Sequence, residues 1–460
     1  MITTHGGGSG LDAGGARGAS STMSEDTTGL PHEVVDRFTG PFSRFLEIEA
    51  ATGAALLLAT LAALAVSNSA WSASFLAFWK TPLGLHFGGW DYARPLRGWI
   101  NDGLMTLFFF VVALELKREL VLGELRHLRM AALSFAGALG GMLVPLAIYI
   151  VLMAGRPGVQ GWGAVMATDT AFLIGCLALV GSRVPPTLRL FLLSLAIFDD
   201  VGAILVVAFG YGHTLNWLPL VLSVIVLAIV AGAAWIGVKS IPVYFVLGGA
   251  IWLCVDASGI HPTVTGVALG LMTPTGAWVS DARLRAILRR LLAYERREHW
   301  SGDTAARRDL QRAGTAVAEA LSPVERLEKM LHPWVGFAVM PIFAFANAGV
   351  AISRVDLWQP VSAAIFAALV LGKPIGVLAF AWLAVRLGFA TRAIGLSWPV
   401  LAAGSLMTGI GFTISLFIAG QAYAPLMLNA AKIGILVASV VSASAGLLML
   451  RTLVHARPAA

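Results

Sequence analysis

Two adjacent aspartates, Asp199 and Asp200, lie in the middle of an apolar run that extends from Leu190 to Val207. An ionised carboxylate at the centre of a bilayer costs at least ~2.5 kcal/mol, so such residues normally face a cavity and mark a path for ions or protons. Two neighbouring carboxylates also oppose each other's ionisation. The alternative is a wrongly placed span with the pair at its end, but long apolar segments on both sides argue against it. The pair therefore predicts an ion or proton site inside a membrane.

The composition assigns most of the 460 residues to a lipid bilayer. The chain is 58% hydrophobic and 12% charged, whereas soluble domains carry about 25% charged residues. Its Lys and Arg residues gather in the segments between apolar runs, which indicates orientation in a membrane and not nucleic-acid binding. Both cysteines, Cys176 and Cys254, fall within apolar spans, so we expect no disulfide framework.

The pattern predicts an all-α integral membrane protein with about twelve transmembrane helices, since a spanning helix needs about 20 apolar residues. The candidate spans are 48–67, 98–121, 130–153, 161–180, 186–210, 216–236, 241–256, 259–274, 332–351, 359–385, 397–421 and 429–453. The seventh and eighth are short, so their boundary is the least defined. The distribution of Lys and Arg predicts that both termini are cytoplasmic.

Three segments outside the spans complete the expected organisation. Residues 1–40 are rich in Gly, Ser and Thr and predict a flexible cytoplasmic tail before a single membrane domain at 41–455. Within that domain, 80–95 predicts a hairpin on the outer face with a Gly-Gly turn. The arginine-rich segment 276–330 predicts a cytoplasmic loop with one or two amphipathic helices against the anionic inner leaflet.

Two spans contain interruptions. The fourth includes Ala167-Thr168-Asp169-Thr170, and the eleventh has three glycines and three hydroxyl residues between Gly404 and Thr413. Non-helical backbone at membrane depth requires satisfaction by protein or by a wet cavity, although close packing through small residues is an alternative for the eleventh span. Spans 3–5 and 10–12 each have the interrupted helix in the middle and run in opposite directions. They therefore predict inverted-topology repeats, with helices 4 and 11 crossing near the midplane at a transport site.

The charged residues near this crossing have predicted partners. Asp169 is expected to neutralise the positive ends of the half-helices, and Lys373, in the tenth span, the negative ends. Because neighbours on a helix are ~100° apart, we expect Asp200 to face a cavity and bind a cation while Asp199 faces Lys373. Snorkelling to the interface is the alternative for Lys373. Carboxylate, hydroxyl and carbonyl oxygens favour a hard cation such as Na⁺ over transition metals.

These and further segments resemble the bacterial NhaA family of sodium/proton antiporters, in family order over about residues 40–455. The matching segments are Asn101–Met105, Leu114–Leu120, Ala167–Phe172, Phe198–Ala203, Gly259–Thr263, Arg326–Glu328, His332–Trp334, Phe343–Gly349, Gly372–Pro374 and Gly409–Thr413. The resemblance implies a twelve-helix inner-membrane antiporter that imports H⁺ and exports Na⁺ or Li⁺, forms a homodimer and needs no cofactor. We expect the dimer to form through the outer hairpin.

The resemblance also implies roles for individual residues. Asp199 and Asp200 match the transport carboxylates, with Thr168 beside the cation site, and Asp169 and Lys373 match residues that stabilise the interrupted helices. A role in the pH response is implied for three further residues, Glu115, Glu119 and Glu328. Lys329 stands where the family pattern leads us to expect a histidine, so the pH-sensing scheme does not transfer in detail.

A second proton carrier, either Asp199 or Lys373, would make the exchange electrogenic, with two protons for each Na⁺. Three other classes of protein share some of these features but fit them less well. A sodium-coupled solute symporter shares the fold features but needs an organic-substrate pocket. An intramembrane aspartyl protease places its aspartates on different helices, and a channel needs no titratable pair.

Overall fold

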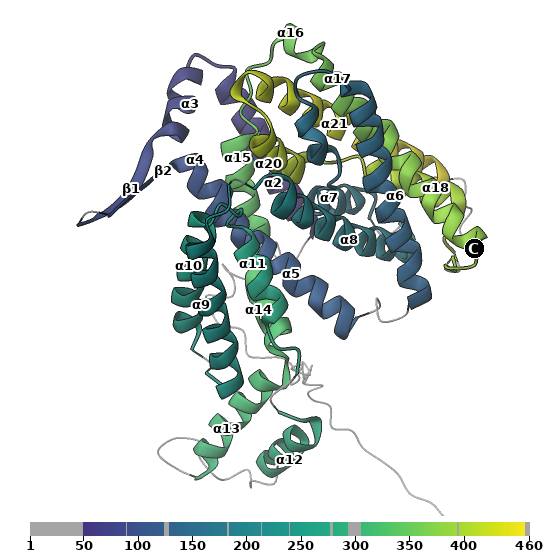
Figure 1. The fold of residues 1–460 in the computed structure, drawn as a ribbon. Coiled ribbons are helices and arrows are strands. Elements are labelled where there is room, and N and C mark those ends of the chain that lie inside the picture. The colour runs from purple at the N-terminus through teal and green to yellow at the C-terminus, as the bar shows by residue number, and fades with distance from the viewer. Residues whose placement is uncertain are drawn as a thin grey trace, which may run out of the picture. The chain divides into compact units, whose positions relative to one another are not determined.

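A computed structural model describes residues 49–455, with gaps at 89, 124–127, 182–183, 213, 239, 277–278, 293–304 and 393–394. The expected tail at 1–40 lies outside the described residues. The described chain is helical apart from one two-stranded antiparallel hairpin (Figure 1).

Seven helical segments in the described part are long and apolar enough to cross a membrane. They are Leu96–Val121, Ala131–Met153, Pro186–Gly210, Trp217–Ile236, Pro323–Asn347, Pro360–Arg386 and Pro425–Leu453. Three bent helix pairs raise this number to ten if each pair is one span. The protein is therefore an all-α membrane protein with a small hairpin.

The expected seventh and eighth spans are the short helices α10 (Ile241–Ala257) and α11 (Val264–Met272). A nine-residue helix is about 14 Å long, roughly half of the hydrocarbon thickness. The sequence between them, Ser258–Thr263, includes Gly259 with a positive φ of 87° and Pro262. These turn residues end the first helix and delay the second, which explains why neither reaches full length.

Residues 49–210 contain the hairpin and the interrupted span formed by η3 and α7. Their elements are α2 (Glu49–Ser67), α3 (Ser72–Lys80), β1 (Pro82–Phe87), β2 (Trp90–Pro95), α4 (Leu96–Gly98), the π-helical turn η1 (Trp99–Leu104), α5 (Met105–Val121), α6 (Leu128–Met153), the 3₁₀ helix η3 (Val159–Val165), α7 (Thr170–Val180) and α8 (Pro186–Gly210).

The remaining residues contain the arginine-rich helices α12 and α13 and the interrupted span formed by α19 and α20. Besides α10 and α11, their elements are α9 (Trp217–Ile236), α12 (Asp281–Leu292), α13 (Ala305–Ala320), α14 (Pro323–Trp334), the π-helical turn η5 (Val335–Val339), α15 (Met340–Asn347), α16 (Arg354–Leu357), α17 (Pro360–Ala367), the π-helical turn η6 (Ala368–Gly372), α18 (Lys373–Arg386), α19 (Trp398–Met407), α20 (Phe412–Ala422) and α21 (Pro425–His455).

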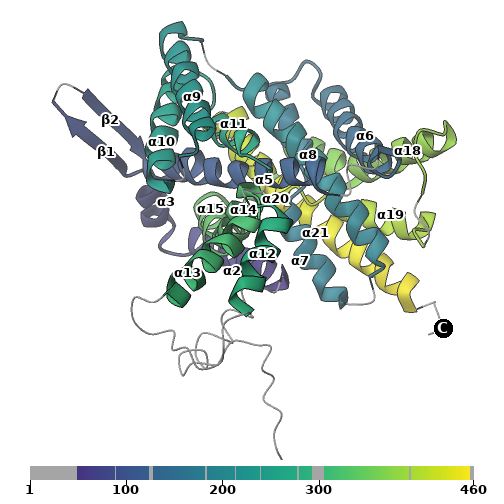
Figure 2. The same cartoon turned by 90° about the horizontal axis from the view of Figure 1, so that it is seen from below.

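Small residues bring the helices around the interrupted spans into close contact. Helices α6 and α18 lie side by side in both views (Figures 1 and 2). Their backbones meet at Gly140 and Gly376, where a Cβ on Gly140 would lie 2.1 Å from the Gly376 carbonyl oxygen. Gly53 of α2 and Gly175 of α7 meet in the same way, with an added Cβ at 2.7 Å from the opposing Cα. Such contacts are typical of helices packed inside membranes.

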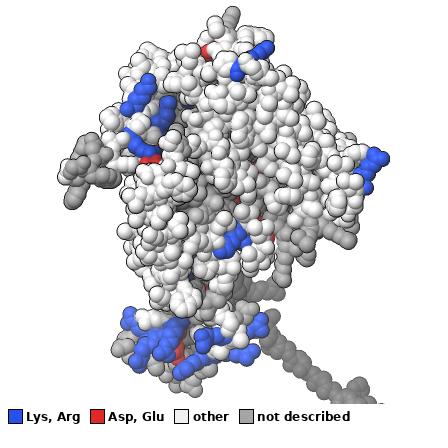
Figure 3. Space-filling model, in the orientation of Figure 1, with Lys and Arg blue, Asp and Glu red and all other residues white. Residues whose placement is uncertain are grey.

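Charge is concentrated at the ends of the bundle. Figure 3 shows helix faces almost free of charged side chains, with Lys and Arg gathered over α12 and α13. These two helices pack against each other, and Asp309 of α13 pairs with Arg290 of α12 at 3.1 Å. We call the end that carries α12 and α13 the inner end, and the end that carries the hairpin the outer end.

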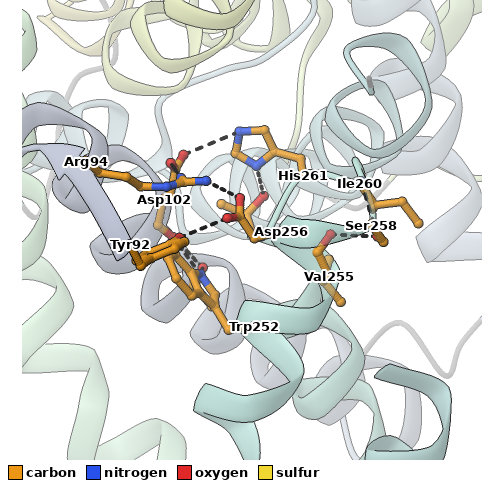
Figure 4. A network of polar contacts seen from close by, with 11 residues as sticks. Tyr92, Arg94, Asp102, Trp252, Val255, Asp256, Ser258, Ile260 and His261 are labelled. Atoms are coloured by element: carbon orange, nitrogen blue, oxygen red, sulfur yellow. Dashed lines mark hydrogen bonds and ion pairs between the residues drawn. The ribbon is translucent and has the colours of Figure 1, made fainter. Parts of the chain in front are cut away.

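A polar cluster joins the base of the hairpin to the outer end of the bundle (Figure 4). The strands pair in the register Pro82↔Pro95 to Phe87↔Trp90. The guanidinium of Arg94 lies between the carboxylates of Asp102 in η1 and Asp256 in α10 and pairs with both. The hydroxyl of Tyr92 donates to Asp256 at 2.9 Å.

Asp102 and His261 both belong to this cluster. Asp102 lies in the π-helical turn η1, and its carboxylate pairs with Arg94. His261 Nε2 lies 3.7 Å from Asp102 Oδ1, and His261 Nδ1 lies 2.9 Å from the hydroxyl of Thr263.

Candidate functional site

The site is built around two breaks in helical backbone. The chain bends by 40° between η3 and α7, and by 46° between α19 and α20. The first break contains Thr168 and Asp169, and the second contains Thr408 to Gly411. All of these residues are buried, so their polar groups require partners within the protein.

Asp169 joins the two breaks. One carboxylate oxygen accepts a hydrogen bond from the backbone N–H of Phe172 at 2.9 Å, which caps α7. The other accepts from the backbone N–H of Thr413 at 2.9 Å and from the Thr413 hydroxyl. The N-cap of α20 is Gly411, which has no side chain to cap the helix, so Asp169 from the other break supplies one. Asp169 thus lies where the sequence predicted it, at the N-terminal ends of both half-helices.

Lys373 and Asp199 form a fully buried ion pair. Lys373 Nζ lies 2.7 Å from Asp199 Oδ2, and both side chains are 0% exposed. The pairing was expected from the sequence, and it excludes snorkelling of Lys373 to the interface. The ammonium also donates to the hydroxyl of Thr168.

The negative end of α19 has a different partner from the one expected. The Thr168 hydroxyl lies 3.0 Å from the backbone carbonyl of Thr408, the C-cap of α19, and 2.6 Å from Asp199 Oδ2. Lys373 was expected to neutralise the negative ends, and its ammonium bonds to Thr168 and Asp199 and not to the carbonyl directly. Thr168 therefore lies between the ion pair and the broken helix, and its single proton serves one of two acceptors at a time.

Asp200 is placed for a different role. Its carboxylate is 4% exposed, and Oδ2 lies 3.4 Å from the hydroxyl of Thr170. Asp200 Oδ1 and Asp199 Oδ1 are buried and have no hydrogen-bond partner among the residues that the structure describes. Buried acceptors are nearly always satisfied in native proteins, so two such atoms on neighbouring residues indicate that a proton or a cation binds here.

The oxygen atoms around Asp200 suit a hard cation. Within the described residues, no group of three or more His, Cys, Asp or Glu is placed to hold a metal ion. A cation at Asp200 would depend on hydroxyl and carbonyl oxygens in addition to carboxylates, and such ligands suit Na⁺.

The three glutamates expected to act in the pH response lie toward the inner end. Arg118 of α5 pairs with Glu119 at 2.8 Å and with Glu328 of α14 at 3.1 Å, so it links two helices. Glu115 lies one helical turn before Glu119 and within electrostatic range of Asp200. The structure thus brings Glu119 and Glu328 to one arginine, with Glu115 one helical turn away on α5.

Sequence reasoning missed the roles of several hydroxyl residues. Thr413, Thr170 and the carbonyl of Thr408 make the contacts described above, and the Ser439 hydroxyl accepts from the backbone N–H of Phe412 at 3.2 Å. The available signal was the absence of a capping side chain at Gly411, because a buried helix start without a cap requires a partner from elsewhere.

Two interrupted helices that cross at buried carboxylates define an ion-coupled secondary transporter of the membrane. The model of the family Na⁺/H⁺ antiporter 1 matches residues 43–450. The chain belongs to this family, whose curated relatives carry the name NhaA.

Relatives match over nearly the whole chain. Na(+)/H(+) antiporter NhaA 2 of Acidiphilium cryptum is 62% identical over 92% of this chain and 94% of its own length. Na(+)/H(+) antiporter NhaA of Rhizobium meliloti is 59% identical over 94% and 99%. The solved sodium proton antiporter MjNhaP1 of Methanocaldococcus jannaschii aligns with a TM-score of 0.46 and 13% identity, over 92% of this chain and 96% of its own.

Proposed function

We propose that this chain exports Na⁺, and Li⁺ by the same chemistry, in exchange for imported H⁺. The observation that carries the proposal is the unpartnered carboxylate oxygen of Asp200 beside the buried Asp199–Lys373 pair. One buried site that holds either H⁺ or Na⁺ exchanges the two ions by competition. The family and the names of its relatives support the same activity.

We infer that each cycle moves two protons for one Na⁺. Asp200 carries the first proton in exchange for Na⁺. The second is carried by Asp199, or by Lys373 as its ion pair with Asp199 breaks and forms again. A lysine changes its protonation state readily when it is buried, and Lys373 is fully buried. Two positive charges in and one out make the exchange electrogenic.

The proposed setting is the bacterial inner membrane. Twelve crossings in inverted repeats would include α10 and α11 as short crossings, with both termini and the segment 276–330 in the cytoplasm. A homodimer would form through the hairpin β1–β2. Glu115, Glu119 and Glu328 would regulate activity with pH, because Arg118 links two of them across α5 and α14.

The decisive experiment measures Na⁺ uptake into proteoliposomes with equal pH on both sides and an imposed membrane potential. Wild-type protein should show a potential-driven Na⁺ flux, and Asp200→Asn should abolish it. The matched control is Asp356→Asn. It removes a carboxylate of α16 that accepts a hydrogen bond from Gln359, and it should keep the flux. A potential-insensitive flux would show one-for-one exchange and remove Asp199 and Lys373 from the proton path.

The topology has its own test. Cysteines introduced at the exposed positions Ser69 and Ala282 should differ in intact cells, with only the first labelled by an impermeant maleimide. Labelling at position 282 would reverse the proposed orientation.

A further inference from the structure

The outer half of the first interrupted span, η3, is held by three tyrosines from three other places in the chain. Tyr149 lies near the end of α6, Tyr211 directly after α8, and Tyr423 directly after α20. Tyr149 and Tyr423 are 0% and 5% exposed. None of the three was singled out by the sequence, and none contacts the carboxylates.

A chain of hydroxyl groups reaches the start of η3. The Tyr149 hydroxyl donates to the carbonyl of Gly158 at 2.7 Å. It is also hydrogen-bonded to the Tyr423 hydroxyl. Since a phenol has one proton, Tyr423 must donate to Tyr149, which in turn donates to Gly158. Gly158 is the N-cap of η3 and has a φ of 103°, so no capping side chain is available there.

The third tyrosine holds the middle of η3. Its hydroxyl donates to the carbonyl of Gln160 at 2.9 Å and accepts from the backbone N–H of Gly163 at 3.0 Å. The ring of Tyr211 also stacks on Trp162, with ring centroids 6.1 Å apart. One side chain therefore satisfies both a donor and an acceptor of the same short helix.

Glycines in η3 make room for these tyrosines. A Cβ on Gly161 would lie 2.0 Å from the ring of Tyr423, and a Cβ on Gly163 would lie 2.7 Å from the hydroxyl of Tyr211. Gly161 thus makes room for Tyr423, and Gly163 makes room for Tyr211. The contact is specific in shape as well as in hydrogen bonding.

Thr168 follows the end of η3 by three residues, so the position of η3 determines where the Thr168 hydroxyl lies. We propose that Tyr149, Tyr211 and Tyr423 are positioning residues that hold η3, and through it Thr168, against the second interrupted helix at the cation site. The link runs from one repeat to the other, because Tyr423 terminates the outer half of the second broken span. This inference rests on the proposed exchange at Asp200.

The link also constrains movement. A displacement of η3 relative to α20 must break either the hydrogen bond from Tyr149 to Gly158 or the one between Tyr423 and Tyr149. These two bonds in series therefore oppose separation of the outer halves of the two interrupted helices.

The test compares phenylalanine variants at the three tyrosines, which keep the rings and remove the hydroxyls. We expect the KM for Na⁺ to rise about fivefold for Tyr423→Phe, which loses one neutral hydrogen bond, and by more for Tyr149→Phe and Tyr211→Phe, which each lose two, with little change in kcat. Tyr149→Phe combined with Tyr423→Phe should raise KM by less than the product of the single effects, because both remove one shared bond. Tyr244→Phe, whose exposed hydroxyl donates to the carbonyl of Val238 at 2.8 Å, is the matched control and should leave KM unchanged.

A second variant tests the shape of the contact. Gly161→Ala should raise KM at least as much as Tyr423→Phe, because its methyl group displaces the ring. Wild-type exchange with an unchanged KM in all three tyrosine variants would overturn the inference. Lower protein yield with an unchanged KM would also overturn it, since that result indicates a purely structural role. Absence of Na⁺-dependent proton flux in the wild type would instead refute the proposed function.

Discussion

Removing Lys373 alone should destabilise the protein far more than removing both members of its ion pair. Lys373 Nζ and Asp199 Oδ2 are 2.7 Å apart and fully buried. Breaking a buried pair by deleting one partner costs about 3–5 kcal/mol, whereas replacing both by neutral groups is often close to neutral. Lys373→Met should therefore be rescued by Asp199→Asn.

The cost should also depend on pH. A lone buried carboxylate favours its protonated form, and taking up a proton costs ~1.4 kcal/mol for each pH unit above about 3.9, the ordinary value for aspartate. That bounds the cost of Lys373→Met at about 4 kcal/mol at pH 7 and about 1.5 kcal/mol at pH 5. The free energy of unfolding of Lys373→Met falls as pH rises, because its folded state holds a proton that the unfolded chain releases above about pH 4.

The assay is the free energy of unfolding in mixed micelles, titrated with a denaturing detergent at pH 5 and pH 7. Lys80→Met, at an exposed lysine that ends α3, is the control for loss of charge alone. A deficit that is equal at both pH values, or a double variant no more stable than Lys373→Met, would refute the reasoning.

Four further outcomes are expected. Asp169→Asn should lower the free energy of unfolding by about 2 kcal/mol, because one charged side chain serves two helix starts at ~1 kcal/mol each; a loss below 0.5 kcal/mol in the same micelle assay would contradict the double cap. Exchange should slow at acidic pH as protons occupy Asp200, and a flux that high Na⁺ fails to restore would point to separate gating. Arg94→Gln should reduce the fraction of the proposed dimer in cross-linking, because it removes the cation that Asp102 and Asp256 share at the base of the hairpin. Burial, with the hydrogen bond to Asp256, raises the pKa of Tyr92 above its ordinary value of 10.0. Above pH 10 the folded protein therefore keeps a proton that the unfolded chain loses, and the free energy of unfolding falls. This fall should be smaller in Tyr92→Phe.

The sequence predicted the parts of this site that follow from helical periodicity. Adjacent positions face different directions, which separated Asp199 from Asp200 and paired the first with Lys373. Charges at membrane depth need partners, which assigned Asp169 to the helix starts. Glycines and hydroxyls inside an apolar run located both interruptions, and long apolar runs located the spans.

Contacts between distant segments were not predictable in this way. Arg94 and Asp256 are 162 positions apart, and no periodic pattern links them. The Thr168 contact with the Thr408 carbonyl depends on how two broken helices cross. Burial is the largest single effect on Arg94, and alone it would lower the pKa of the guanidinium. The carboxylates of Asp102 and Asp256 together outweigh burial and raise that pKa. Only the folded arrangement determines that balance.

The π-helical turn η6 directly precedes Lys373. Such a turn contains one residue more than a regular α-helical turn. The helix before it and the helix after it are therefore out of phase by about 100°. Deleting one residue within Ala368–Gly372 would restore a uniform helix, but it would swing Lys373 away from Asp199 by that angle. The π-helical turn thus separates two faces of this span. One is the face by which α17 packs on α21, and the other is the face of α18 that carries the Lys373 ammonium. Substitutions that alter the packing of α17 therefore need not alter the direction of the Lys373 side chain.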